Sequence, residues 1–203
     1  MVKAARYFPV VLVIFHIIGF ALFMTDSSAA RLSYINLLLC GALVFLAESK
    51  LVKLLPVFCI IFIAGFLLEL IGTKTGYLFG DYAYGTSLGL RWYGVPLIIG
   101  LNWFAIVVSA CNVSRRFNAS VEVQAILAGL LATLLDFLIE PVAVRFGFWH
   151  WRGTEIPVYN YVCWFIFSAA FSYLYLNYTS GKNTTAFYLF FIWTVFFISL
   201  NIF

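Results

Sequence analysis

Residues 121–140 read VEVQAILAGLLATLLDFLIE, an almost unbroken apolar run that contains two acids near its end. A helix of this length spans the roughly 30 Å of hydrocarbon in a bilayer. Asp136 and Glu140 are four residues apart, so on a helix they share one face. An ionised acid in the middle of a membrane costs roughly 2.5–3.5 kcal/mol, and such residues usually face a helix bundle, a water cavity or a partner.

Six further apolar runs flank this one. With it, they cover residues 7–24, 33–49, 54–72, 95–112, 121–140, 157–178 and 185–203. The chain has 203 residues, of which 65% are hydrophobic and only 10% charged. A water-soluble domain cannot hide so much apolar surface. The sequence therefore predicts an all-α, polytopic integral membrane helix bundle with about seven transmembrane helices, in a single domain that covers residues 1–203.

The basic residues predict how the chain is oriented. Seven spans would place one set of loops beside Lys3, Arg6, Lys50, Lys53, Arg115, Arg116 and Lys182, and the other beside Arg31, Lys74, Arg91, Arg145 and Arg152. The first set is denser, so we expect it in the cytoplasm, with a cytoplasmic N-terminus and extracytoplasmic long loops at 73–94 and 141–156. The first run is longer than a signal-peptide core, which favours a retained helix. We expect the protein in the inner (cytoplasmic) membrane.

Three acids are the candidate reactive groups. Glu69, Asp136 and Glu140 all fall toward the extracytoplasmic ends of their spans, so they could converge on one site. The alternatives are structural ion pairs, of Glu140 with Arg145 and of Glu69 with Lys74. Asp136 has no such partner in the sequence.

Polar and aromatic residues near the acids are candidates for substrate binding. They are Asn102 and Trp103 in the fourth run, Asn160 and Trp164 in the sixth, and Tyr82, Tyr84, Trp149 and Trp151 in the two long loops. The alternative, purely structural roles are an interfacial aromatic belt for the loop residues and helix–helix hydrogen bonds for the asparagines. A helix–helix hydrogen bond is also the expectation for His16, alone in the first run.

Several classes of function are disfavoured. The two histidines lack a paired spacing, so we expect no metal site. No phosphate loop or dinucleotide fingerprint is present, and we expect no cofactor. The net charge of +4 is modest and unclustered, which indicates contact with anionic lipid and not with nucleic acid.

Two segments resemble the signatures of the CruF-type carotenoid 1′,2′-hydratase family of bacteria and haloarchaea. The first is Glu69-Leu-Ile-Gly72…Thr75-Gly76-Tyr-Leu-Phe79-Gly80-Asp-Tyr82-Ala-Tyr84…Gly94-Val95-Pro96…Asn102-Trp103, and the second is Asp136-Phe-Leu-Ile-Glu140-Pro141…Gly147-Phe-Trp149-His-Trp151…Pro157-Val-Tyr-Asn160…Trp164. The likeness covers about residues 65–170.

The resemblance implies that water is added to the terminal C-1′,2′ double bond of an acyclic carotenoid end. The expected substrate resembles lycopene or γ-carotene, with membrane lipid, water and candidate carotenoid-synthesis enzymes as partners. An acid protonates the alkene, and water captures the tertiary cation. On this reading Asp136 is the acid, Glu140 and Glu69 position or deprotonate the water, Asn160 orients it, and Trp149, Trp151 and Trp164 surround the cation. A non-catalytic carotenoid or isoprenoid-lipid binding protein and a small proton-coupled carrier remain the alternatives.

Overall fold

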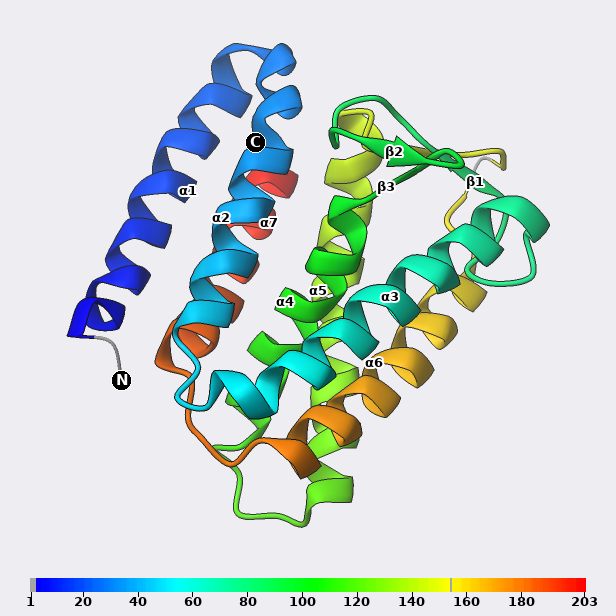
Figure 1. Cartoon of the computed structure of the whole chain (residues 1–203). Helices are drawn as coiled ribbons and strands as arrows, with labels where there is room; N and C mark the ends of the chain where they lie inside the picture. Colours follow the sequence, from blue (N-terminus) through cyan, green and yellow to red (C-terminus); the bar gives the residue numbers. More distant parts are fainter. Residues whose placement is uncertain (1–2, 154) are drawn as a thin grey trace.

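The structure, a computed structural model, describes residues 3–153 and 155–203, and in these ranges it contains seven α-helices (Figure 1). The helices are α1 (Phe8–Thr25), α2 (Ser33–Leu46), α3 (Leu51–Thr75), α4 (Ile98–Ser114), α5 (Val121–Arg145), α6 (Val158–Tyr178) and α7 (Thr184–Ile202). Short 3-10 turns, Lys3–Tyr7 and Ser27–Leu32, precede α1 and α2. Each predicted apolar run coincides with one helix, so the prediction of a helical bundle is confirmed.

Within the described residues, five helical segments are long and apolar enough to cross a membrane. They are Ala5–Thr25, Ser28–Leu46, Leu51–Thr75, Val121–Arg145 and Thr184–Ile202. Helix α4 is apolar but has only 17 residues. Helix α6 has 21 residues, among them polar residues and tyrosines that lower its hydropathy. That all seven helices span the membrane therefore stays a prediction.

Helix α5 is longer than the sequence predicts. The apolar run was expected to end at Glu140, but the helix continues through Pro141 to Arg145. Proline removes one backbone donor, yet its fixed φ is itself helical. The extra turn buries Val142 and Ala143, and this packing favours continuation of the helix.

Helix α4 is the centre of the bundle. It packs against α2, α3, α5, α6 and α7, and most of its side chains are buried. The helices around it expose large apolar side chains, for example Val52, Ile63 and Val195. An apolar outer surface is the expected property of a bundle solvated by lipid.

Two pairs of short strands cover one end of the bundle (Figure 1). Strand β1 (Tyr82–Tyr84) pairs antiparallel with β4 (Trp149–Trp151), and β2 (Arg91–Trp92) pairs with β3 (Val95–Pro96). Helix α3 ends before this cap at Gly76, whose φ of 68° is left-handed and suits glycine. The strands were not predicted. They join the two long loops into one layer over the helices.

A buried polar cluster ties the other end of the bundle together. Tyr175 donates a hydrogen bond to Glu48 at 2.9 Å and lies beside Asn112 and Arg115. Arg115 also donates to backbone carbonyls of the connection between α6 and α7. These bonds hold α2, α4 and α6 in place at the end opposite the strands.

Candidate active site

The register of β1 and β4 directs four aromatic donors into the bundle. Tyr82 is opposite Trp151, and Tyr84 is opposite Trp149. Alternate residues of a strand point to the same face, so these four side chains share one face and Ala83 points to the other. The facing pairs are in contact, with ring centroids 5.1 Å apart for Tyr82 and Trp151, and 5.9 Å apart for Tyr84 and Trp149.

Glu69 lies directly beneath this face on α3 and is buried, with 4% exposure. Its Oε2 accepts hydrogen bonds from the phenols of Tyr82 and of Tyr84, the second at 2.8 Å. Its Oε1 accepts a bond of 3.0 Å from the Trp103 indole on α4. Three neutral donors therefore hold this carboxyl in one orientation.

The two tyrosines stay in their donating form. Burial, and then the nearby carboxyl of Glu69, raise the pKa of Tyr82 well above its usual value. The same two causes, in the same order, raise the pKa of Tyr84. A phenol with a raised pKa keeps its proton and donates it in a hydrogen bond.

Asp136 and Glu140 form a second group of carboxyls, on α5. The Nδ2 atom of Asn160, from the start of α6, donates to Asp136 Oδ2 at 3.0 Å and to Glu140 Oε1 at 3.2 Å. Glu140 Oε2 accepts bonds from the indoles of Trp149 at 2.9 Å and Trp151 at 3.0 Å. Asp136 and Glu140 are 1% and 2% exposed, so both are shielded from solvent.

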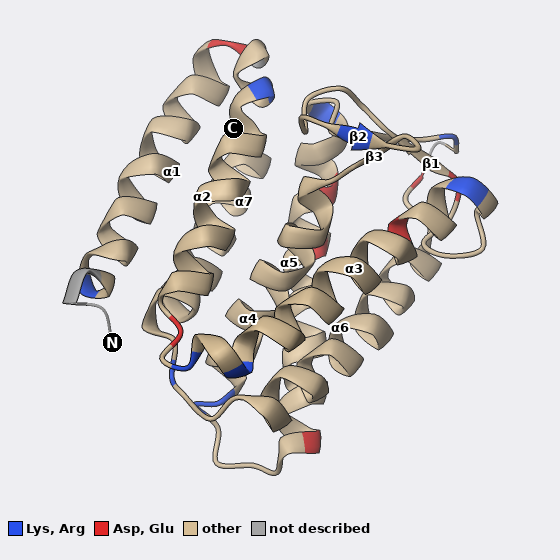
Figure 2. Cartoon of the chain, in the orientation of Figure 1, with Lys and Arg blue, Asp and Glu red and all other residues tan. Residues whose placement is uncertain are grey.

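The strand pair connects the two acid groups. Tyr82 and Tyr84 bind Glu69, while their cross-strand neighbours Trp151 and Trp149 bind Glu140. Figure 2 shows acidic stretches of α3 and α5 in the half of the bundle nearest the strands. The three acids expected to converge are thus collected under one cap.

Stacked aromatic rings form one wall beside Glu69. The rings of Trp103 and Trp164 are parallel within 9°, with centroids 4.1 Å apart. Phe79 packs against both from the loop after α3, with a left-handed φ of 66° and 2% exposure. Phe79 was not among the site residues expected from the sequence, although it stands in the first segment that resembles the family signatures.

The structural ion pairs considered for the acids do not form. Arg145 donates instead to the Leu200 carbonyl of α7. Within the part of the chain that is described, the one salt bridge joins Arg152 to Asp81, at 3.3 Å on the surface. The buried carboxyls are therefore held by neutral donors and not by cations.

Asn102 is the candidate that the structure does not bring to the acids. It is half-buried on α4 and lines a separate small cavity, which Trp149 also borders. His16 borders the same cavity. Its Nδ1 faces the Leu12 carbonyl of its own helix at 2.7 Å, and its Nε2 is 3.5 Å from Asn36 on α2.

The arrangement suits acid–base chemistry on an apolar molecule. Three buried carboxyls can hold or move a proton, and aromatic faces beside them can stabilise a developing positive charge. In residues 3–153 and 155–203, no three His, Cys, Asp or Glu side chains are grouped so as to hold a metal ion.

Comparisons with known proteins point to carotenoid synthesis. The family model described as "carotenoid biosynthesis protein" matches residues 10–202. A bisanhydrobacterioruberin hydratase of Haloarcula japonica is 29% identical over 109 residues, which are 49% of this chain and 36% of that protein. The match thus spans about a third of the length of this relative. No solved structure is significantly similar to the chain.

Proposed function

The chain belongs to the family of carotenoid biosynthesis proteins, and from this premise we propose that it is a membrane-embedded carotenoid hydratase. The proposed reaction adds water across the terminal C-1′,2′ double bond of an acyclic carotenoid end and gives a tertiary alcohol. The observation that carries the proposal is the cluster of Glu69, Asp136 and Glu140, buried under one aromatic cap. We also propose that all seven helices cross the inner membrane.

Asp136 is the proposed acid. Among the described residues it accepts a single hydrogen bond, from Asn160, whereas Glu69 and Glu140 each accept three. Donors stabilise the ionised form of a carboxyl, so the one with fewest donors is best suited to carry the proton. The alkene's π electrons form a new C–H bond at C-2′ with the Asp136 proton, and the positive charge develops at C-1′.

Glu140 is the proposed base. Water attacks C-1′ and gives its surplus proton to Glu140, and transfer of that proton to Asp136, its neighbour across Asn160, restores the starting state. The faces of Trp149, Trp151 and Trp164 stabilise the cation before water arrives. Glu69, the third acid of the cluster, helps to position the water.

The proposal is tested by producing the protein in a bacterium engineered to make carotenoids with acyclic ends. We expect extracted pigments to gain the mass of one water per reacted end. The Asp136→Asn variant should lose activity by about 100-fold or more, the usual contribution of a general acid. Glu122→Gln is the matched control, because Glu122 lies exposed at the other end of α5.

Two outcomes would contradict the proposal. Unchanged pigments, with folded wild-type protein and several acyclic-ended substrates, would exclude the hydratase. Retention of bound pigment by both wild type and Asp136→Asn, with no change of mass, would support a non-catalytic carotenoid-binding protein instead.

A further inference from the structure

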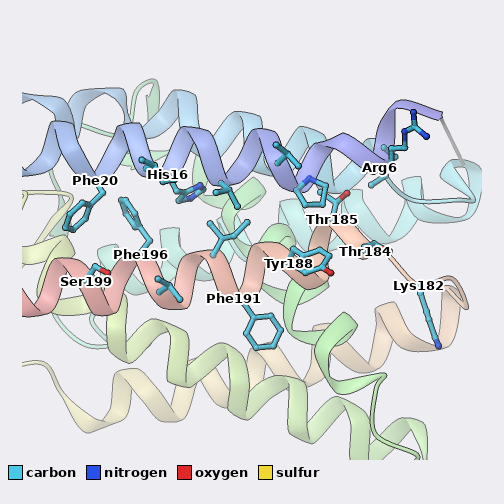
Figure 3. A pocket seen from close by; sticks show the side chains of 18 residues that line it. Arg6, His16, Phe20, Lys182, Thr184, Thr185, Tyr188, Phe191, Phe196 and Ser199 are labelled. Carbon is cyan, nitrogen blue, oxygen red and sulfur yellow. The ribbon is translucent and has the colours of Figure 1, made fainter.

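A long groove runs between α1 and α7 on the outside of the bundle (Figure 3). It has a volume of about 1540 Å³, and its walls are mainly apolar side chains such as Val13, Ile17 and Val195. Ile17 and Val195 are each 64% exposed, so the groove opens on the face that the bundle presents to lipid. From Pro9 to Phe20 it follows α1 for about 17 Å, more than half of the hydrocarbon thickness.

A small inner cavity of about 70 Å³ lies behind this groove. His16 and Phe196 line both spaces, so these two side chains separate them. Their rings meet edge to face, with centroids 5.2 Å apart. Figure 3 shows both side chains between the ribbons of α1 and α7.

The inner cavity borders a residue that contacts the acids. Its wall includes Trp149, whose indole donates to Glu140, and Ile139, the residue next to Glu140 on α5. The groove, the pair of rings and the inner cavity therefore follow one another from the lipid to Trp149, which separates the cavity from Glu140.

We propose that the groove between α1 and α7 holds the polyene chain of the substrate, which arrives sideways from the membrane. The inference rests on the proposed function. A carotenoid is dissolved in hydrocarbon, so its path should open to lipid and be lined by apolar groups. The inner cavity is too small for the long chain, so only the reactive end passes His16 and Phe196 to approach Trp149.

Bulky substitutions in the groove test this inference. Ile17→Trp and Val195→Trp should each lower hydration of a long-chain carotenoid by about tenfold, because they fill the space the chain would occupy. The matched controls are Ile14→Trp on α1 and Ile198→Trp on α7. Both residues are exposed to lipid, and neither lines the groove, so their activities should stay within about twofold of wild type.

Photo-crosslinking gives a second readout that does not depend on turnover. A benzophenone amino acid at position 195 in the Asp136→Asn background should capture an acyclic carotenoid, and the same group at position 198 should not. Equal capture at both positions, or capture of phospholipid alone at 195, would refute the groove as the binding site.

If wild type hydrates carotenoids and all four Trp variants do so equally, the groove inference fails while the hydratase stands. If wild type hydrates none, the proposed function itself fails.

Discussion

Asn160 uses one amide nitrogen to bridge Asp136 and Glu140, so it orients both carboxyl groups. We expect Asn160→Leu to destabilise the protein by about 1–3 kcal/mol, because two buried carboxyls lose a donor. The rate of carotenoid hydration should also fall. Thermal unfolding in detergent measures the loss of stability, and the pigment assay measures the loss of activity.

Asn177→Leu provides the control on the same helix. Asn177 is exposed and, in the part of the chain that the structure describes, donates only to the Tyr173 carbonyl of its own helix, so this change should be nearly neutral. An Asn160→Leu variant as stable and active as Asn177→Leu would contradict the bridging role.

Because of the two tyrosines that contact Glu69, we expect the free energy of unfolding to fall at alkaline pH. The pKa of Tyr82 and of Tyr84 is higher in the folded protein than in the unfolded chain. Unfolding therefore becomes more favourable once the pH is high enough to ionise these tyrosines in the unfolded chain. Their contribution to stability is complete below about pH 10, the ordinary tyrosine pKa, and is lost as the pH rises toward the folded values. We expect a Tyr82→Phe, Tyr84→Phe variant to lose less unfolding free energy than wild type above that pH.

Denaturation at a series of pH values measures this difference, with Tyr77→Phe as control because Tyr77 is 79% exposed. Parallel pH profiles for wild type and the double variant would show that the two phenols do not contribute as inferred.

At the scale of elements, the contact between α3 and α4 sets the position of the aromatic wall. Gly65 on α3 faces Trp103, and a Cβ added there would lie 2.7 Å from the indole Cγ. Gly65→Ala should therefore push Trp103 away from Glu69 and Trp164, and cost about 1–3 kcal/mol. Gly19→Ala is the control, since its Cβ would lie 3.8 Å from Phe196, an ordinary contact. Unfolding measurements report the loss of stability, and tryptophan fluorescence reports the displacement of Trp103. Equal stability of Gly65→Ala and Gly19→Ala would contradict this prediction.

The elements also show what could be predicted from the sequence. Apolar runs of membrane length predicted every helix, because length and composition decide that signal locally. The strands could not be predicted in this way, because three residues such as Tyr82–Tyr84 are too few to show an alternating pattern. Their pairing with Trp149–Trp151 depends on how α3 and α5 end, and not on local sequence.

The candidate site, too, could be predicted only in part from the sequence. Buried acids in apolar runs were visible in the sequence, since a charge there is costly. Their donors were not assignable, because the contacts of Glu69 with Tyr82 and Tyr84 follow from strand register. Asn102 and Trp103 are adjacent in sequence, yet their helix turns one to a cavity and the other to Glu69.

For the whole molecule, the basic residues predict which end of the bundle faces the cytoplasm. The connections α2–α3, α4–α5 and α6–α7 gather at one end, opposite the strands (Figure 1). They carry Lys50, Arg115, Arg116 and Lys182, so the density of basic residues predicts that this end is cytoplasmic. The acids and their cap would then lie in the extracytoplasmic half of the bilayer.

Labelling of single introduced cysteines in intact cells tests this orientation. Thr86, in the loop of the cap, and Asn118, between α4 and α5, are both exposed. We expect Thr86→Cys to react with a membrane-impermeant maleimide in intact cells, and Asn118→Cys to react only after lysis. The reverse pattern would invert the orientation but leave the chemistry in place, because the acids, their donors and the groove are fixed to one another by the bundle and not by the direction in which it is inserted.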